Sequence, residues 1–429
     1  MQFYNAHSHV FTMRNAPKKF LQLYLPKVVA NSIDSITNVK AGAWAMQLLL
    51  KKFGGNWGKR YASFLQIGKS QDQLSVFETL MSQYNDTTMK FIALSMYMEK
   101  CGADVSETGF EGQLEELLMI KKQYPDHLLI FMGIDPRWKY TGEELRKLVE
   151  DYFKKKIQVS ATRSVYPFVG LKIYPSLGFY AFDERLKPTF EWAADNGVPV
   201  LSHCNYLGGI FNNETSYIKA NLDPFDVYSR KQYSKNFPNL TPPRYHEKKS
   251  WFKKILGTED NDPNMNTCSY FLEPASFRTM IDHFNKKAKP LKICLAHFGG
   301  DAHILAEHGE GTATQLYGML QQNWCAQIKD LMKEYPGVYT DISYAVAKEA
   351  VHKHIFDELN VPEYGKRILF GTDFFLTERE MPEKDNYEKF KERAMLYQLP
   401  NFNKSAWEQI AGSNVESFLN SNFYQDKVI

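Results

Sequence analysis

Residues 2–11 read QFYNAHSHVF and place two histidines, His7 and His9, on either side of a single serine. Side chains two residues apart in a β-strand point to the same face. If this stretch is a strand, the two imidazoles lie side by side, and neutral histidine is a good ligand for zinc and similar ions. Two polar residues on a solvated strand face would give the same pattern. The pair therefore predicts a metal site only if the rest of the chain supplies more ligands.

Seven further apolar, strand-like stretches follow, and most of them precede an amphipathic helical stretch. Near-continuous apolar strands are typical of a parallel sheet that is covered on both faces. Together with the first stretch they make eight strand–helix units, which predict an α/β fold, the (β/α)8 TIM barrel. The seven stretches are 89–99, 127–138, 168–179, 198–205, 291–301, 337–345 and 367–376.

The chain of 429 residues is longer than a plain barrel, which needs about 250. Two long segments, 11–85 and 206–270, account for the excess, and we expect both to be insertions in a single domain spanning 1–429. Each follows the carboxyl end of a predicted strand. We therefore expect both insertions on the catalytic face of the barrel, where they would wall in the pocket and exclude water.

Composition excludes several classes of protein. The net charge is +3, from 52 basic and 49 acidic residues, so no overall field favours nucleic acid. The longest apolar run, AGAWAMQLLL at 41–50, is too short to span a bilayer, and a chain that starts inside a predicted strand leaves no room for a signal peptide. The five scattered cysteines form no Cys-x-x-Cys and predict free thiols in a reducing cytoplasm.

Polar residues collect at the carboxyl ends of the predicted strands, where barrel enzymes place their chemistry. A histidine or aspartate inside a buried apolar strand must be paired or ligated, because burying it alone is costly. Any one of these residues could be a satisfied core group, but their occurrence at the same end of one barrel predicts a shared site. The residues are His7, His9, Lys172, Tyr174, His203, His297 and Asp373.

This order of residues resembles the amidohydrolase superfamily. The flanking stretches VPVLSH (198–203), LAHFGG (295–300) and ILFGTDFF (368–375) resemble the amidohydrolase-related branch that includes aminocarboxymuconate-semialdehyde decarboxylase. The closing stretch IAGSNVESFL (410–419) resembles the last helix of that branch. The resemblance covers the barrel strands and does not extend to the two insertions.

The resemblance implies that His7, His9, His203 and Asp373 ligate one divalent metal ion, most simply zinc. A metal with an open position lowers the pKa of its bound water and polarises a substrate oxygen. Asp373 would also act as the general base, and His297 would hold the water or polarise the substrate.

Lys172 and Tyr174 share a strand face and are expected to contact substrate. Some members of the superfamily carry a carbamylated lysine on the fourth strand that bridges two metals. Three roles are open for Lys172: a cationic contact to an anionic substrate, a carbamate bridge, and a salt bridge at the rim. We expect the contact to substrate.

The resemblance permits more than one reaction. A hydrolase attacking a C–N or C–O bond of a small anionic substrate is the first expectation, and a metal-dependent decarboxylase on the same site is the alternative. A barrel that binds without catalysis would be expected to lose His203 or Asp373. The basic stretch 230–254 is the only feature that favours a nuclease. We expect it to be a solvated loop beside an anionic pocket instead, because the rest of the chain is balanced in charge. The expected partner is a small molecule; the sequence does not indicate the oligomeric state.

Four other histidines are expected to lie away from this site. His303 and His308 follow the sixth strand and are predicted in a surface loop. His352 and His354 fall on a predicted helix and are expected to be solvated.

Overall fold

A computed structural model of the chain describes residues 1–18, 70, 72–101, 104–205, 271–285, 290–311 and 322–424. The predicted insertion 206–270, with its basic stretch 230–254, lies outside these residues, as does most of the predicted insertion 11–85. The expectation that both insertions wall in a pocket therefore stays a prediction.

The core of the protein is a sheet of eight parallel strands in the order β1-β2-β3-β6-β7-β8-β9-β10. This architecture confirms the predicted (β/α)8 barrel. The strands are shorter than the apolar stretches that predicted them, because their polar carboxyl ends leave the ladder and turn into the site. Their bounds are β1 Tyr4–Ser8, β2 Lys90–Leu94, β3 Leu128–Gly133, β6 Phe168–Ile173, β7 Val200–Ser202, β8 Ile293–Leu295, β9 Val338–Asp341 and β10 Ile368–Leu369.

The barrel closes where the chain after β10 runs beside β1. The Ala6 N–H donates to the Phe370 carbonyl at 2.8 Å, and the His9 N–H donates to the Phe374 carbonyl at 2.7 Å. Between them, the Asp373 N–H donates to the His7 carbonyl at 2.9 Å. We call these three hydrogen bonds the closing seam. They bring the first and last parts of the chain together in one register.

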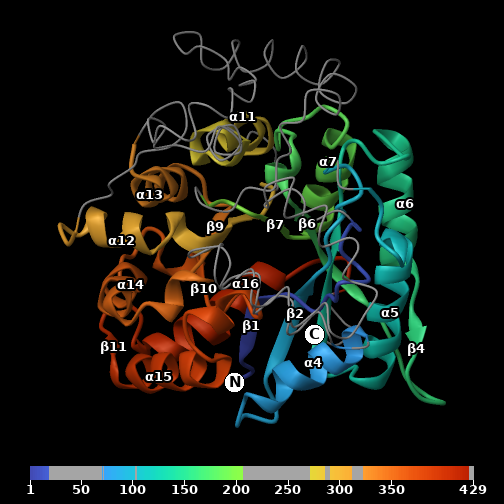
Figure 1. Ribbon diagram of the computed structural model, residues 1–429. Helices are drawn as coiled ribbons and strands as arrows, with labels where there is room; N and C mark the ends of the chain where they lie inside the picture. The colour runs from blue at the N-terminus through green and yellow to red at the C-terminus, as the bar shows by residue number, and fades with distance from the viewer. Residues whose placement is uncertain are drawn as a thin grey trace, which may run out of the picture.

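Helices surround the strands in a ring that follows chain order for most of its length (Figure 1). The helix α4 falls inside the segment predicted as the first insertion, yet it packs beside α5 and completes the ring between β1 and β2. The helices are α4 Gln73–Ser82, α5 Gly109–Gln123, α6 Glu143–Lys154, α7 Lys187–Asn196, α11 Pro274–Asn285, α12 Asp301–Glu307, α13 Trp324–Glu334, α14 His352–Leu359, α15 Glu383–Leu396 and α16 Asn414–Leu419.

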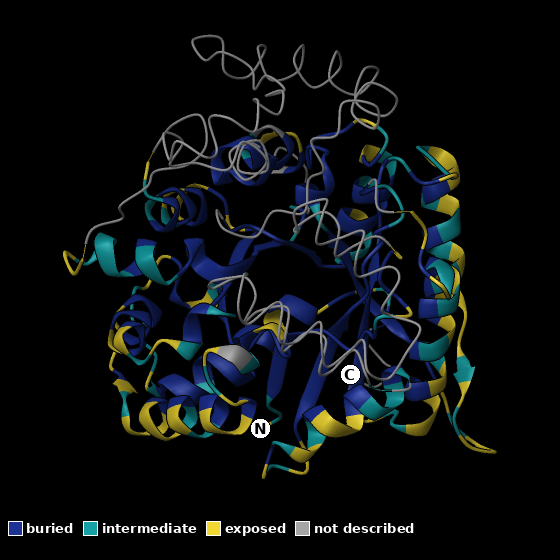
Figure 2. Ribbon diagram, in the orientation of Figure 1, coloured by how far each residue is buried: buried dark blue, intermediate teal, exposed yellow. Residues whose placement is uncertain are grey.

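Several ring helices, among them α4, α5, α6 and α15, bury one face against the barrel and carry exposed residues on the other (Figure 2). In α6 the buried residues Leu145, Val149 and Phe153 recur every four positions, which is the spacing of one helical face. The strands, by contrast, are buried along almost their whole length, as in the LLIFMG of β3. Among the helices that the structure describes, none combines the length and the apolar character needed to cross a membrane.

The helix α16 covers the amino-terminal end of the barrel. The Asn414 side chain donates to the Ile368 carbonyl at the start of β10 at 2.7 Å, and the Phe418 ring lies 4.9 Å from the Tyr339 ring of β9. This end is therefore filled by apolar and satisfied polar groups, which leaves the opposite end for the site. Two antiparallel pairs, β4 Ile157–Gln158 with β5 Ser164–Val165 and β11 Gln398–Leu399 with β12 Lys404–Ser405, lie outside the barrel sheet.

The expectation of exposed histidines was wrong for three of the four. His303 is fully buried, and its Nδ1 accepts the Trp324 N–H at 2.9 Å. His352 and His354 are also buried, and His352 Nε2 donates to the Val346 carbonyl at 2.7 Å. Each lies on the covered face of a helix or turn, so a polar residue type on a helix did not indicate a solvated one.

A buried network of hydrogen bonds connects α15 to the closing seam. The Asn5 amide donates to the Tyr84 hydroxyl and to Thr372 Oγ1, both at 2.8 Å, and Thr372 Oγ1 donates to the Glu383 carboxylate at 2.7 Å. The Tyr84 hydroxyl donates to the same carboxylate oxygen. Burial of Glu383 raises the pKa of its carboxyl to about 7, although these two hydroxyl donors act in the opposite direction.

The raised pKa of Glu383 makes stability depend on pH. Between pH 4.5 and 7 the folded protein keeps a proton on Glu383 that the unfolded chain releases, so the free energy of unfolding should fall as pH rises through this window. Glu383→Gln keeps the acceptor oxygen and removes the ionisation. We expect the fall from this group, up to about 3 kcal/mol, to be absent in the variant when denaturant unfolding is compared at pH 4.5 and 7.5. Equal pH dependence in both proteins would contradict the assignment.

Candidate functional site

Six of the seven predicted site side chains are buried at the carboxyl end of the barrel. His7 lies on β1 and His9 just after it; Lys172 lies on β6, and His203 follows β7. His297 lies in the 3₁₀ turn Ala296–Gly299 after β8, and Asp373 follows β10. Tyr174, which follows β6, is partly buried. The shared location is the one that the sequence predicts.

His7, His9 and Asp373 form the tightest group of potential metal ligands. His7 Nε2 lies 3.4 Å and His9 Nε2 lies 3.3 Å from the same Asp373 oxygen, Oδ1. One ligand atom from each residue lies within 4.8 Å of the other two. Within the described residues, His7 Nε2 and Asp373 Oδ1 have no hydrogen-bond partner although both are buried. Buried polar atoms without partners are costly, so these atoms fit a bound ion.

The backbone of the closing seam determines the positions of His7, His9 and Asp373. Asp373 has a φ of +63°, a conformation that non-glycine residues rarely adopt, and its N–H is held by the His7 carbonyl. Two residues earlier, Gly371 allows the chain to pass close to β1. A Cβ built at Gly371 would lie 2.6 Å from the His7 Cβ, which is well inside van der Waals contact.

His203 and His297 form a second group. His203 Nδ1 lies 3.0 Å from His297 Nε2, and His203 Nε2 has no hydrogen-bond partner among the described residues. Within those residues, His203 belongs to neither of the two groups whose ligand atoms all lie within 4.8 Å of one another. The structure thus brings His203 beside His297, and its predicted role as a metal ligand stays a prediction.

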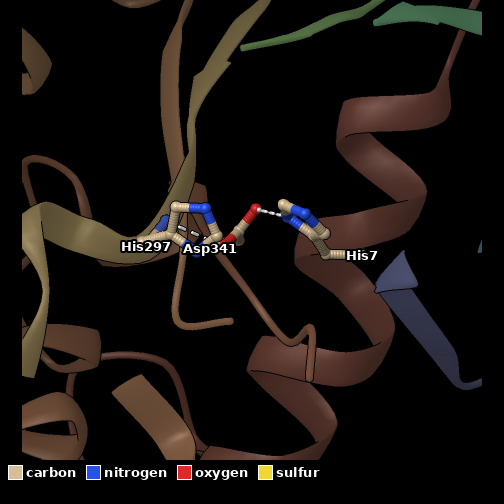
Figure 3. A group of neighbouring side chains, drawn as sticks. All are labelled: His7, His297 and Asp341. Atoms are coloured by element: carbon tan, nitrogen blue, oxygen red, sulfur yellow. Dashed lines mark hydrogen bonds and ion pairs between the residues drawn. The ribbon is translucent and has the colours of Figure 1, made fainter. Parts of the chain in front are cut away.

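The sequence prediction did not include Asp341 and Ser343, which lie beside this site. Asp341 ends β9, and its carboxylate lies between the His7 ring and the His297 backbone (Figure 3). Its Oδ2 lies 2.9 Å from His7 Nδ1, and its Oδ1 accepts the N–H groups of His297 and Ser343 at 3.0 Å. The signal was present in the stretch VYTDIS (338–343), where Asp341 interrupts a buried strand at its carboxyl end, as Asp373 does after β10.

Lys172 is fully buried inside the barrel, which excludes the salt bridge at the rim. Its Nζ has no hydrogen-bond partner within the described part of the chain and lies 5.7 Å from the centre of the Tyr174 ring. The Tyr174 ring in turn lies 4.6 Å from the His203 ring. Burial lowers the pKa of Lys172 to about 8, against the attraction of Asp341 and Asp373. An ammonium in this position can bind an anionic group that enters the barrel.

The charge states of the group suit a divalent ion. Burial lowers the pKa of His7 to about 4 and the pKa of His203 well below the ordinary histidine value, which favours the neutral form of each ring. Burial of Asp373 raises the pKa of its carboxyl, but His9 and His7 together bring that pKa below its ordinary value. Neutral imidazoles and an ionised carboxylate are the forms that coordinate a metal.

Comparison with protein families gives one match. A family model described as Amidohydrolase matches residues 102–414, which is more than half of the chain. The matched region contains Lys172, His203, His297, Asp341 and Asp373, and it begins after His7 and His9. No curated protein sequence matched the chain.

Solved structures with a similar fold share little sequence with this chain. A 5-carboxyvanillate decarboxylase from Novosphingobium aromaticivorans, solved with bound manganese, is 13% identical, with 97% of each chain covered and a TM-score of 0.51. The 5-carboxyvanillate decarboxylase from Sphingomonas paucimobilis is 12% identical over 97% of this chain and 98% of that one, with a TM-score of 0.48. A TIM-barrel protein from Bordetella bronchiseptica is 13% identical over 98% of each chain, with a TM-score of 0.45. At these identities the likeness concerns the fold.

The close approach at Gly371 gives a test of the group. We expect Gly371→Ala to push His7 away from Asp373, to destabilise the fold by about 1–3 kcal/mol, and to weaken the binding of Zn²⁺. Gly142→Ala is the control, because its Cβ would meet nothing within 4 Å while its φ of +57° still imposes a backbone cost. Titration of Zn²⁺ against a competing chelator checks both variants. Equal Zn²⁺ affinity in Gly371→Ala and wild type would contradict the placement of His7.

Proposed function

Because the chain belongs to the amidohydrolase family, we propose that it is a metal-dependent hydrolase that attacks a C–N or C–O bond of a small anionic substrate. The observation that carries this proposal is the convergence of His7 Nε2, His9 Nε2 and Asp373 Oδ1 at the carboxyl end of the barrel. Two of these three buried atoms lack a hydrogen-bond partner among the described residues, which an ion would supply.

In this proposal His7, His9, His203 and Asp373 hold one divalent ion. When bound, the ion would lower the pKa of a water molecule and polarise the substrate. Zinc is the first candidate, because nitrogen and carboxylate ligands with an open position are typical of catalytic zinc sites. Manganese is the second, because the barrel decarboxylase of similar fold contains it.

The other side chains would act on the substrate and its protons. Asp373 would accept a proton from the attacking water and return it to the leaving group. Lys172 would pair with an anionic group of the substrate beside the Tyr174 ring, since its buried ammonium otherwise lacks a hydrogen-bond partner in the described residues. His297, beside His203, would stabilise negative charge that develops on the substrate oxygen.

Decarboxylation is the second candidate, and Lys172 is the observation that favours it. A buried ammonium inside the barrel matches a substrate carboxylate, and one barrel of similar fold is a 5-carboxyvanillate decarboxylase. The remaining parts of the proposal are a cytoplasmic location, which four buried free cysteines fit, and a small-molecule partner with no nucleic acid.

The experiment that separates the two reactions follows both products. Protein loaded with Zn²⁺ or Mn²⁺ is incubated in ¹⁸O-water with a panel of small lactones, amides, cyclic imides and aromatic acids, all carrying a carboxylate. Hydrolysis adds one ¹⁸O to the product, whereas decarboxylation releases CO₂ and adds no oxygen. Turnover that survives complete removal of metal by a chelator would contradict the proposed function.

A matched pair of lysine variants tests the role of Lys172 on the same substrate. Lys172→Met should raise KM for the carboxylated substrate by about tenfold or more and leave the metal content unchanged, because a charged partner is lost. Lys139→Met is the control, since Lys139 is exposed and pairs with Glu111 outside the barrel. An unchanged KM in Lys172→Met would remove Lys172 from the substrate site, and a loss of metal would favour the carbamate bridge.

A further inference from the structure

Asp341 collects more hydrogen-bond donors than any ligand candidate of the site. Its Oδ1 accepts the His297 and Ser343 N–H groups and the Ser343 hydroxyl, and its Oδ2 faces His7 Nδ1 and the Cys294 thiol. Four of these groups are donors that point at the same side chain, and an ionised carboxylate, which can only accept hydrogen bonds, is the form that receives them.

The acceptor at Asp341 decides which nitrogen of His7 carries the proton. His7 Nδ1 lies 2.9 Å from Asp341 Oδ2, so Nδ1 must hold the hydrogen that is donated. A neutral imidazole has only one N–H, so His7 Nε2 keeps its lone pair. That lone pair is the atom that faces Asp373 Oδ1.

A second chain of donors and acceptors starts at the backbone of the same stretch. His297 Nδ1 lies 3.1 Å from the Ser343 carbonyl, which has no proton to give, so Nδ1 donates. A ring with this single N–H has a bare Nε2, and that atom lies 3.0 Å from His203 Nδ1. His203 Nδ1 must be the donor of this bond, which leaves the lone pair on His203 Nε2.

The Ser343 hydroxyl fits the same assignment. It lies 2.9 Å from His297 Nδ1 and 3.0 Å from His7 Nδ1, and it is hydrogen-bonded to Asp341. Its single proton goes to the carboxylate, which cannot donate. The hydroxyl oxygen then accepts from the two rings. Each Nδ1–H is shared between this oxygen and a second acceptor, which is Asp341 Oδ2 for His7 and the Ser343 carbonyl for His297.

The geometry points to Asp341 and the Ser343 carbonyl as positioning groups that fix the tautomers of three histidines. Asp341 sets His7 directly, and the carbonyl sets His203 through His297. Both His7 and His203 then present an Nε2 lone pair, and both Nε2 atoms lack a hydrogen-bond partner within the described residues. Only an unprotonated nitrogen can ligate a metal, so the stretch 341–343 prepares the site before any ion arrives.

The inference rests on the proposed metal-dependent function in one respect, namely that the Nε2 lone pairs of His7 and His203 are used to ligate an ion. The tautomers themselves are a property of the metal-free protein. They can be measured on protein labelled with ¹⁵N-histidine at pH 8, where long-range ¹H–¹⁵N correlations separate the Nδ1–H and Nε2–H forms of each ring. Single substitutions of the histidines assign the signals.

We expect His7, His203 and His297 all to be Nδ1–H in metal-free wild-type protein. An Nε2–H form at His7 or His203 would overturn the inference without any variant. If the three tautomers are as expected but the protein binds no Zn²⁺, the proposed function fails while the inference stands.

Asp341→Asn gives a sharper test at nearly constant size. The three donors on Oδ1 hold the amide oxygen of the asparagine there, so the amide NH₂ faces His7 Nδ1. His7 should switch to the Nε2–H form, and Zn²⁺ affinity measured by chelator competition should fall about 10–100-fold. Cys294→Ala is the matched control, since it removes the thiol 3.7 Å from the same Oδ2 and leaves the bond to His7 intact. Unchanged His7 tautomer and Zn²⁺ affinity in Asp341→Asn would overturn the role of Asp341.

Discussion

The site depends on the closing seam between the first and last strands of the barrel. Three backbone hydrogen bonds hold residues 6–9 beside residues 370–374 in one register. A one-residue slip of a parallel pair would turn every side chain to the other face. Such a slip would therefore separate His7 from Asp373. These two residues come from opposite ends of the chain and meet only because the seam holds them in register. Two features support this register. Gly371 has no side chain to push β1 away, and buried hydrogen bonds join Asn5 to Thr372 and Thr372 to Glu383.

Around the seam, function and stability make opposite demands on buried polar atoms. Most of the polar groups near β1 and β10 are satisfied, as at Asn5 and Asp341. Among the described residues, four of the buried atoms that lack a hydrogen-bond partner lie where a ligand would sit: His7 Nε2, His203 Nε2, Lys172 Nζ and Asp373 Oδ1. Unusual backbone accompanies them, since His297 and Asp373 both have positive φ. Such costs persist in a fold only when the surrounding structure imposes them, and they are typical of functional positions.

The sequence predicted the barrel, its strand order and the end at which polar residues gather, because these follow from apolar periodicity and from the direction of parallel strands. It missed Asp341 and Ser343, which the same rule would have found, since Asp341 also ends a buried strand. The resemblance to a family concerns the ligands and not the groups that orient them. Strand lengths, the partners of His203 and the burial of His303, His352 and His354 were beyond a single sequence, because they depend on which faces of neighbouring elements meet.

The central claim is that the carboxyl ends of the strands form one metal site. Anomalous diffraction at the zinc edge, from crystals of the protein loaded with Zn²⁺, tests it most directly. The account predicts a single peak within coordination distance of His7 Nε2, His9, His203 Nε2 and Asp373, with His297 and Lys172 outside that distance. No peak at these residues, or two peaks bridged by a modified Lys172, would contradict it.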